Sequence, residues 1–348
     1  MKYILSVWLT LAVLGTGAQE ILVPLATETT DSEIDIQLKN NSLTLDKISK
    51  IPARVFAAKN LHTLRIFVSD SLKELSPEVR NLVNLHHLSI DHTGLAELPG
   101  EIGKLKNLTF LRLAFNNISR LPKEFTELRN LKSLDLSAMF LVELPQDIGN
   151  LTNLETLTAN ENRATYRQQI PGLEAPVHGL EIPKSIGKLK NLKKLEFYAN
   201  GTTILPPEIG KLKSLEKLVL LFNKIESLPK ELGKLSKLKI LDLRMNQLKE
   251  IPKEIGQLKN LEFLHLENNK LEHLPKELGQ LSNLKELFLF GNRISVEEVN
   301  ELQAMLPKTR IWHILKQRSR ITMRSALIRS RQSRKHFLHR RDQPGKYR

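Results

Sequence analysis

Residues 98–120 read LPGEIGKLKNLTFLRLAFNNISR, and Leu121 begins the same 23-residue pattern again. The Leu or Ile that opens the pattern recurs at positions 75, 98, 121 and 144, and then at 182, 205, 228, 251 and 274. The step from 144 to 182 is longer because its 38 residues hold one 23-residue unit plus an insertion of 15 residues. A fixed period of roughly 20 to 50 residues indicates stacked structural units, so we expect a repeat array.

Each unit changes its apolar spacing halfway along. The L-x-L segment alternates as a β-strand does, whereas L-P-x-E-I-G-x-L-x-x-L has the spacing of a tight helical turn. Both sets of leucines then point inward, and stacked units pair their strands in parallel. The predicted fold is an α/β solenoid, a horseshoe with a parallel concave β-sheet and short helical or 3-10 turns on the convex side.

An asparagine closes the strand segment of most units. A side-chain amide both donates and accepts hydrogen bonds, so these residues are predicted to satisfy buried backbone groups between turns. They are Asn116, Asn162, Asn200, Asn223, Asn246, Asn269 and Asn292. Met139 takes this place once and has no amide, so we expect a local irregularity there.

The repeat consensus LPxEIGxLxxLxxLxLxxNxL, with the ending ISxEExxxLxxxLPK at 294–308, resembles the secreted and surface leucine-rich repeat proteins of leptospiral spirochaetes. The same repeat class is similar to intracellular Ras-pathway scaffolds and their plant relatives. The resemblance implies a non-catalytic binder, and in the leptospiral family it implies contact with host surface proteins or glycans.

The two ends of the chain differ from the repeats. Residues 4–14 are apolar apart from Ser6 and Thr10, and small residues follow, which is typical of a secretory signal peptide cleaved before Gln19. An uncleaved segment on a cytoplasmic protein is the alternative. No other stretch approaches about 18 consecutive apolar residues, so we expect no membrane-spanning helix.

The net charge of +15 lies mostly at the C-terminus. Residues 308–348 hold 14 Lys and Arg against one acid, Asp342, which leaves 39 − 37 = +2 for residues 1–307. Nucleic-acid binding by the repeats is therefore disfavoured, because a nearly neutral body lacks a basic stripe. Three interpretations of the tail remain open: an arm that binds sulfated glycans or other polyanions, a solvated extension, or sequence from a shifted reading frame.

These observations predict five segments. They are a signal peptide at 1–18, an N-terminal cap and partial repeat at 19–50, leucine-rich repeats at 51–294 with an insertion at 163–179, a C-terminal cap helix at 295–315, and a basic disordered tail at 316–348. Ser295 and Glu298 form the capping box that opens the cap helix.

Catalysis has little support in the sequence. The chain has no Cys, which excludes thiol nucleophiles and thiolate metal sites, and no Gly-rich phosphate loop occurs. The best metal candidate is the group His86, His87, Asp91 and His92, but a surface cluster is the favoured interpretation because no further ligand has a suitable spacing. We therefore expect no enzyme activity, no cofactor and no metal.

A partner surface is the stronger expectation. Strand positions that flank each L-x-L should face the concave side, and in the second half of the chain they are unusually apolar, which indicates a protein-binding patch. The predicted contact residues are Val219, Leu221, Phe222, Ile240, Arg244, Met245, Phe263, His265, Glu267, Phe288 and Phe290, with Tyr166 and Arg167 on the inserted loop. The first half is expected to be more polar and without an anchor.

The sequence thus predicts a secreted or surface-exposed protein-interaction module that binds a macromolecular partner, such as a host protein, through its concave face. Two alternatives stay open. One is an intracellular scaffold for signalling proteins, and the other is a glycan or polyanion binder that acts through the basic tail.

Overall fold

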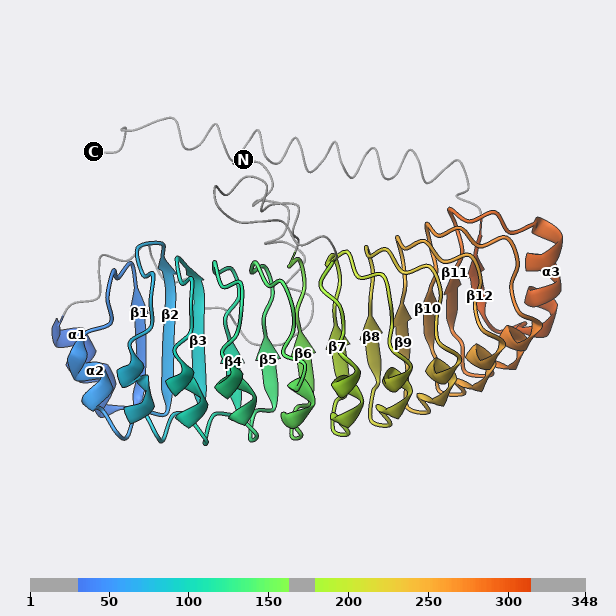
Figure 1. The fold of residues 1–348 in the computed structure, drawn as a ribbon. Helices are drawn as coiled ribbons and strands as arrows, with labels where there is room; N and C mark the ends of the chain where they lie inside the picture. The colour runs from blue at the N-terminus through green and yellow to red at the C-terminus, as the bar shows by residue number, and fades with distance from the viewer. Residues whose placement is uncertain (1–30, 163–178, 314–348) are drawn as a thin grey trace, which may run out of the picture.

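The computed structural model describes residues 31–162 and 179–313. Twelve parallel strands form one sheet in strict chain order, from β1 to β12. The strands are β1 (Ser42–Asp46), β2 (Thr63–Ser69), β3 (His87–Thr93), β4 (Phe110–Arg112), β5 (Ser133–Asp135), β6 (Thr156–Thr158), β7 (Lys194–Glu196), β8 (Lys217–Val219), β9 (Ile240–Asp242), β10 (Phe263–His265), β11 (Glu286–Phe288) and β12 (Arg310–Trp312). Figure 1 shows them side by side, as the predicted solenoid requires.

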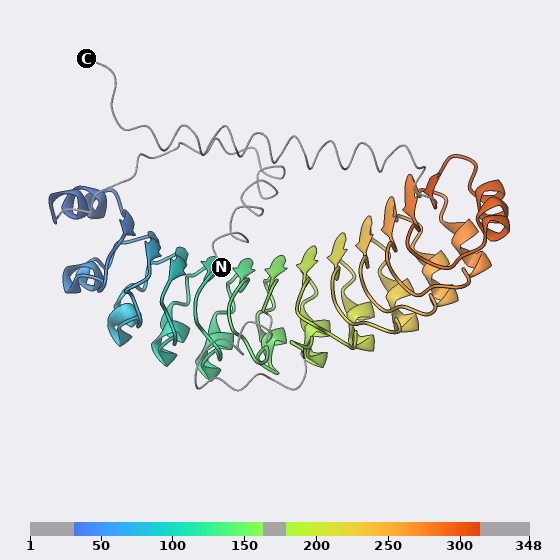
Figure 2. The same ribbon diagram turned by 90° about the horizontal axis from the view of Figure 1, so that it is seen from above.

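Helical turns return the chain from one strand to the next. They are the 3-10 turns η2 (Pro77–Asn81), η3 (Gly100–Lys104), η4 (Lys123–Glu127), η5 (Ile148–Asn150), η7 (Lys184–Lys188), η8 (Pro207–Lys211), η9 (Lys230–Lys234), η10 (Lys253–Gln257) and η11 (Lys276–Gln280). Figure 2 shows the strands on the inner side of the arc and the turns on its outer side. The predicted horseshoe with a concave sheet is confirmed.

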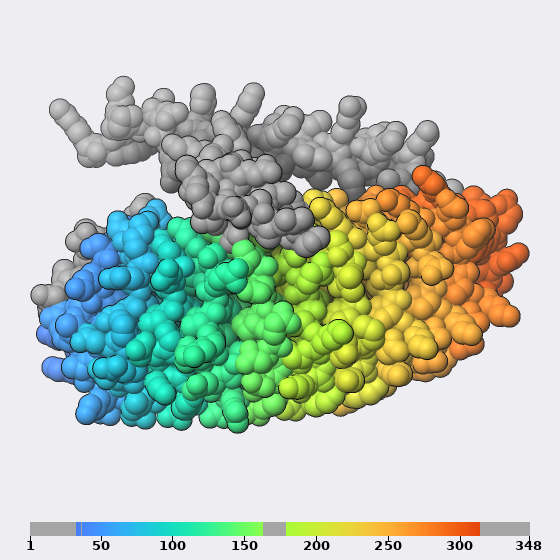
Figure 3. All heavy atoms as spheres, in the orientation of Figure 1, coloured from blue at the N-terminus to red at the C-terminus, as the bar shows by residue number. Residues whose placement is uncertain are grey.

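The core is a continuous column of leucine and isoleucine between sheet and turns. In the repeat of β10, Leu264 and Leu266 are fully buried while His265 between them reaches the concave face. Turns of neighbouring repeats pack closely: a Cβ on Gly233 would collide with the backbone carbonyl of Glu254. Figure 3 shows the repeats packed into a continuous body without gaps between them.

The asparagines bond as predicted. The Asn246 amide nitrogen donates to the carbonyl oxygens of Leu220 and Leu243 at 2.9 and 3.0 Å, and its oxygen accepts from the Ile225 N–H at 3.1 Å. The irregularity expected at Met139 is absent. Strand β5 keeps its register with both neighbours, because Asn162 of the next repeat donates to the Leu136 carbonyl at 2.9 Å.

Helices cover both ends of the sheet. At the N-terminus α1 (Asp31–Lys39) and α2 (Ala53–Ala57) flank β1. At the C-terminus α3 (Val296–Met305) begins at Ser295, whose hydroxyl accepts from the Glu298 N–H at 3.1 Å. The Glu298 carboxylate does not complete a capping box; it accepts from the Leu274 N–H of the preceding repeat instead.

The end of the solenoid differs from the expected cap helix. After α3 the chain forms β12, which pairs with β11 and adds a twelfth strand to the sheet. The 15-residue insertion leaves the stack intact, since β6 and β7 pair directly with Thr156 opposite Lys194. Within the described ranges, no helix is both long and apolar enough to cross a bilayer.

Candidate binding face

The strand pairing places equivalent residues of successive repeats in rows across the concave face. Phe263 on β10 lies between Ile240 on β9 and Glu286 on β11, and His265 lies between Asp242 and Phe288. Because side chains alternate along a strand, the residues at these positions point away from the leucine core. The register that the sequence predicted for the apolar patch is therefore the register of the sheet.

An aromatic ladder lies at the C-terminal end of this face. The ring centroids of His265 and Phe288 are 4.4 Å apart and those of Phe288 and Trp312 are 6.0 Å apart, with interplanar angles of 6° and 2°. Arg310 and Lys285 place cations 5.6 and 5.9 Å from the rings of Trp312 and Phe263. Sequence reasoning did not include Trp312, because it assigned that residue to the cap helix.

The predicted patch residues differ in how much surface they offer. Phe222 and Met245 are 39% and 45% exposed, whereas Val219 and Glu267 are only 6% and 3% exposed. The remaining predicted contact residues in the described part of the chain are all half-buried. They are Leu221, Ile240, Arg244, Phe263, His265, Phe288 and Phe290. Tyr166 and Arg167 lie outside the described residues. A partner would reach little of Val219 or Glu267.

Most charges on this face are already paired with each other. Arg244 donates two hydrogen bonds to Asp242, the shorter at 2.6 Å, and these bonds raise the pKa of Arg244. His265 Nδ1 lies 3.3 Å from the Glu267 carboxylate. Fixed internal pairs cost a partner less to desolvate than free charges do, so the apolar side chains dominate what this face can bind.

The first half of the face also carries exposed apolar side chains. Phe67, Val68 and Phe115 are 38%, 56% and 42% exposed, and His92 stacks on Phe115 with centroids 4.0 Å apart. Val68 and Phe115 precede the polar residue that ends the strand segment, as Phe222 does. This shared position in the repeat could have identified Val68 and Phe115 as exposed residues from the sequence.

The histidine group on β3 belongs to this cluster of rings rather than to a metal site. His87 stacks on Phe110 at 4.1 Å, and burial together with the Arg65 charge lowers its pKa to about 4. The Asp91 carboxylate accepts hydrogen bonds from Arg112 and Ser89. Among the described residues, no three His, Cys, Asp or Glu side chains are grouped as metal ligands.

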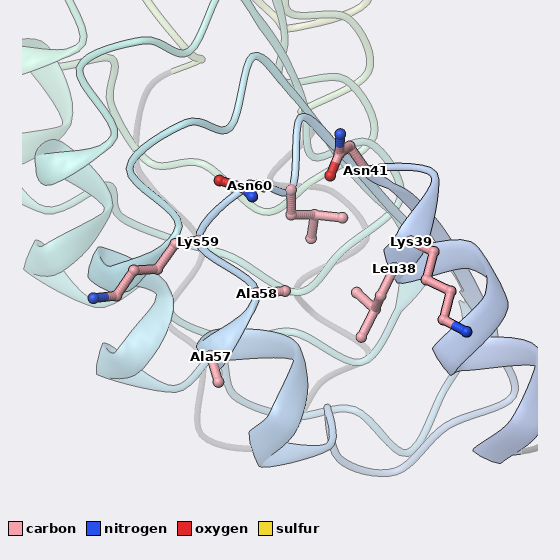
Figure 4. Close-up of a pocket in the computed structure, with 8 residues that line it drawn as sticks. Leu38, Lys39, Asn41, Ala57, Ala58, Lys59 and Asn60 are labelled. Atoms are coloured by element: carbon pink, nitrogen blue, oxygen red, sulfur yellow. The ribbon is translucent and has the colours of Figure 1, made fainter.

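A shallow hollow lies at the N-terminal cap, next to α1 and α2. Figure 4 shows Leu38 and Ala58 lining it, while the ammonium groups of Lys39 and Lys59 point away from one another. Its polar side chains, which also include Asn41 and Asn60, lie at separate points around an open hollow, whereas a small-molecule site brings a few polar groups together in a concave cavity. The concave face is therefore the better candidate.

Comparisons with known proteins place the repeats of this chain in a wider group. A family model described as a leucine-rich repeat region matches residues 54–175 and 218–333. A leucine-rich repeat protein of Leptospira interrogans is 30% identical, with 82% of this chain and 93% of that chain covered and a TM-score of 0.34. A comparison with curated protein sequences gives no match.

Two further solved structures resemble the fold. An internalin of Listeria monocytogenes is 20% identical over 81% of this chain and 84% of that chain, with a TM-score of 0.58. The Arabidopsis receptor kinase HAESA, solved with the peptide hormone IDA and the co-receptor SERK1, is 26% identical with a TM-score of 0.58. That match covers 74% of this chain and 43% of the receptor chain.

Proposed function

This chain belongs to the leucine-rich repeat family, and from that premise we propose that it is a non-catalytic protein-interaction module. It is secreted or surface-exposed and binds a macromolecular partner, such as a host protein, through its concave face. Solved relatives with the same fold include a receptor in complex with a peptide hormone and a co-receptor, which supports a role in protein binding.

One observation carries the proposal. On β10 to β12 the concave residues His265, Phe288 and Trp312 follow one another in one row, and the exposed side chains of Phe222 and Met245 lie just past the ends of β8 and β9. Such a run is unusual on a sheet face that meets solvent and is typical of an interface core rich in aromatic residues. Several solenoid rows together supply the roughly 800 Å² per partner of a standard interface.

The patch is tested by a double substitution, Phe222→Glu with Phe263→Glu. We expect the partner to be lost, because two buried carboxylates would face an apolar surface without counter-charges. Proteins cross-linked to the wild type and to the variant are compared by quantitative mass spectrometry. Val83→Glu is the matched control, since Val83 is 48% exposed but lies between η2 and β3. Equal capture by wild type and double variant would contradict the assignment.

Export is supported by the apolar segment near the N-terminus. The intact mass of the native protein, recovered separately from culture medium and cell pellet, tests it. A species in the medium that begins at Gln19 agrees with secretion. A full-length species confined to the pellet would contradict it and would favour the intracellular scaffold.

Polyanion binding is the second candidate, and the 14 basic residues within 308–348 favour it. Deleting 316–348 should then shift elution from a heparin column to lower salt, because clustered cations bind polyanions with salt-sensitive affinity. Unchanged elution would exclude the tail as the binding element.

A further inference from the structure

One backbone position in nearly every repeat has a left-handed conformation. It is the residue just before the ladder asparagine, and its φ is +57° at Phe222, +54° at Met245, +55° at Asn268 and +75° at Gly291. A Cβ at positive φ crowds the neighbouring carbonyl, a conflict that Gly avoids and that Asn tolerates better than most residues. Asn268 and Gly291 are therefore the residue types that the fold itself prefers at this position.

The left-handed backbone conformation at positions 222 and 245 does not favour the large side chains of Phe222 and Met245. Both are bulky, and their exposures of 39% and 45% place much of each side chain in solvent. Residues held in unfavourable backbone conformations gather at functional sites, where the interaction they make outweighs the local cost. The exposed part of each side chain is apolar surface that a partner can contact.

Basic residues recur at one position of these repeats, close in sequence to the apolar pair. Two residues after each left-handed position the chain carries Lys224, Gln247, Lys270 and Arg293. Arg293 pairs with Glu272 at 3.0 Å, whereas Lys270 donates to the Gln247 side chain at 2.9 Å. Among the described residues no carboxylate lies within ion-pair distance of Lys224 or Lys270, and the nearby Lys270 charge helps to lower the pKa of Glu226, which pairs with Lys249.

The first half of the molecule provides the contrast. Val68 and Phe115 hold the same left-handed position at φ +52° and +59°, but the residues two further on are Asp70 and Asn117. Among the described left-handed positions, Phe222 is therefore the exposed apolar residue with a lysine two residues on, and Lys270 supplies a second lysine from the repeat after that of Met245.

We infer that Phe222, Met245, Lys224 and Lys270 form a docking rim for a partner segment that combines apolar side chains with carboxylates. This inference rests on the proposed function and names the class of partner. The apolar side chains of the segment cover Phe222 and Met245, and its Asp or Glu residues meet the two lysines. Charge complementarity at the border of an apolar contact fixes which segments bind and speeds their association.

The test uses three synthetic eight-residue peptides, alternating Glu–Leu, Lys–Leu and Glu–Ser, and the full-length protein. Fluorescence anisotropy should show that Glu–Leu binds at least about tenfold tighter than either other peptide, with an affinity that falls as salt rises. Equal binding of Glu–Leu and Lys–Leu would overturn the inference.

Two substitutions at the same backbone position locate the site. Met245→Asn copies Asn268 of the next repeat, so we expect Glu–Leu binding to fall about tenfold with no loss of melting temperature. Val68→Asn makes the same change beside Asp70 and should leave binding unchanged. Equal weakening by both variants, or a collapse of the melting temperature in Met245→Asn alone, would overturn the assignment.

Charge reversal separates this inference from the function on which it rests. Lys224→Glu with Lys270→Glu should exchange the preference, so that Lys–Leu binds better than Glu–Leu. If the peptides do not discriminate while Phe222→Glu with Phe263→Glu still abolishes partner capture, the concave face binds a partner and the acidic–apolar class is wrong.

Discussion

The two halves of the solenoid differ in how regularly asparagines satisfy their buried backbone groups. In the repeats of β8 to β11 an asparagine ends each strand segment, and its amide bonds to carbonyls of its own and of the preceding repeat. In the first half Ser69, Thr93 and Met139 stand at this position in the repeats of β2, β3 and β5, and asparagine stands there only in those of β4 and β6. The Thr93 hydroxyl donates to the Asn116 side chain at 2.5 Å, so it joins the ladder at its first asparagine.

Strand length changes with the ladder. Strands β2 and β3 each have seven residues and still pair at Ser69 opposite Thr93, whereas every strand from β4 to β12 has three. Strand pairing thus supplies in the first repeats what side-chain amides supply in the later ones. The difference teaches that the asparagine is a stabilising substitute for sheet hydrogen bonds, and that its loss should matter most where strands are short.

Removing a ladder amide in the second half should have the largest effect. Asn246→Ala leaves the buried N–H of Ile225 without its acceptor and removes amide donors from two carbonyls, so we expect a loss of about 3 kcal/mol. Thr93→Ala removes one hydroxyl from the longer strands and should cost about 1 kcal/mol. Urea denaturation with hydrogen exchange measures both, because exchange assigns the loss to individual repeats. Equal losses would break the comparison.

Lowering the pH should destabilise the first half of the solenoid more than the second half. The pKa of His87 is lowered to about 4 by burial and by Arg65, and burial lowers the pKa of His92 as well. Below pH 6.5 these histidines bind protons in the unfolded chain but remain neutral in the folded chain. The free energy of unfolding therefore falls as the pH drops from 6.5 towards 4. After allowance for solvent screening, we expect a loss on the order of 2 kcal/mol.

Hydrogen exchange at pH 6.8 and 5.0, corrected for intrinsic rates, checks this expectation. Peptides from β2 to β4 should lose protection at the lower pH, and His87→Phe should remove most of that loss while keeping a ring against Phe110. The same loss of protection in β8 to β10 would show that the response is not local to these histidines.

The sequence predicted the fold from its period, because a 23-residue repeat with a change from helical to strand spacing allows one stacking. It also predicted the concave rows, since strand alternation fixes which residues leave the core. It did not predict strand β12, because residues 310–312 lack the L-x-L pattern and pair only as the last strand of an existing sheet. Burial of Val219 and Glu267 depends on the size of neighbouring side chains, which spacing does not reveal.

Met139 allows the ladder to be extended into the first half. Its side chain is buried, and its N–H already donates to the Asn162 side chain at 3.2 Å, as ladder geometry requires. Met139→Asn should therefore add amide bonds to preformed carbonyls and raise the free energy of unfolding by about 1 kcal/mol, net of the lost thioether burial. A lower stability in urea denaturation would show that the core of the first half has adapted to Met.

The smallest effect should come from the exposed ion pairs that link repeats in the second half. Lys239 Nζ lies 2.8 Å from the Glu216 carboxylate, and the hydrogen bond between them lowers the pKa of Glu216. Both side chains are about half exposed, at 51% and 42%, so water screens the pair and ordering two long side chains offsets its attraction. Lys239→Ala should leave the denaturation midpoint unchanged at low and at high salt. A midpoint that falls at low salt alone would assign part of the second half's stability to surface charge rather than to its asparagines.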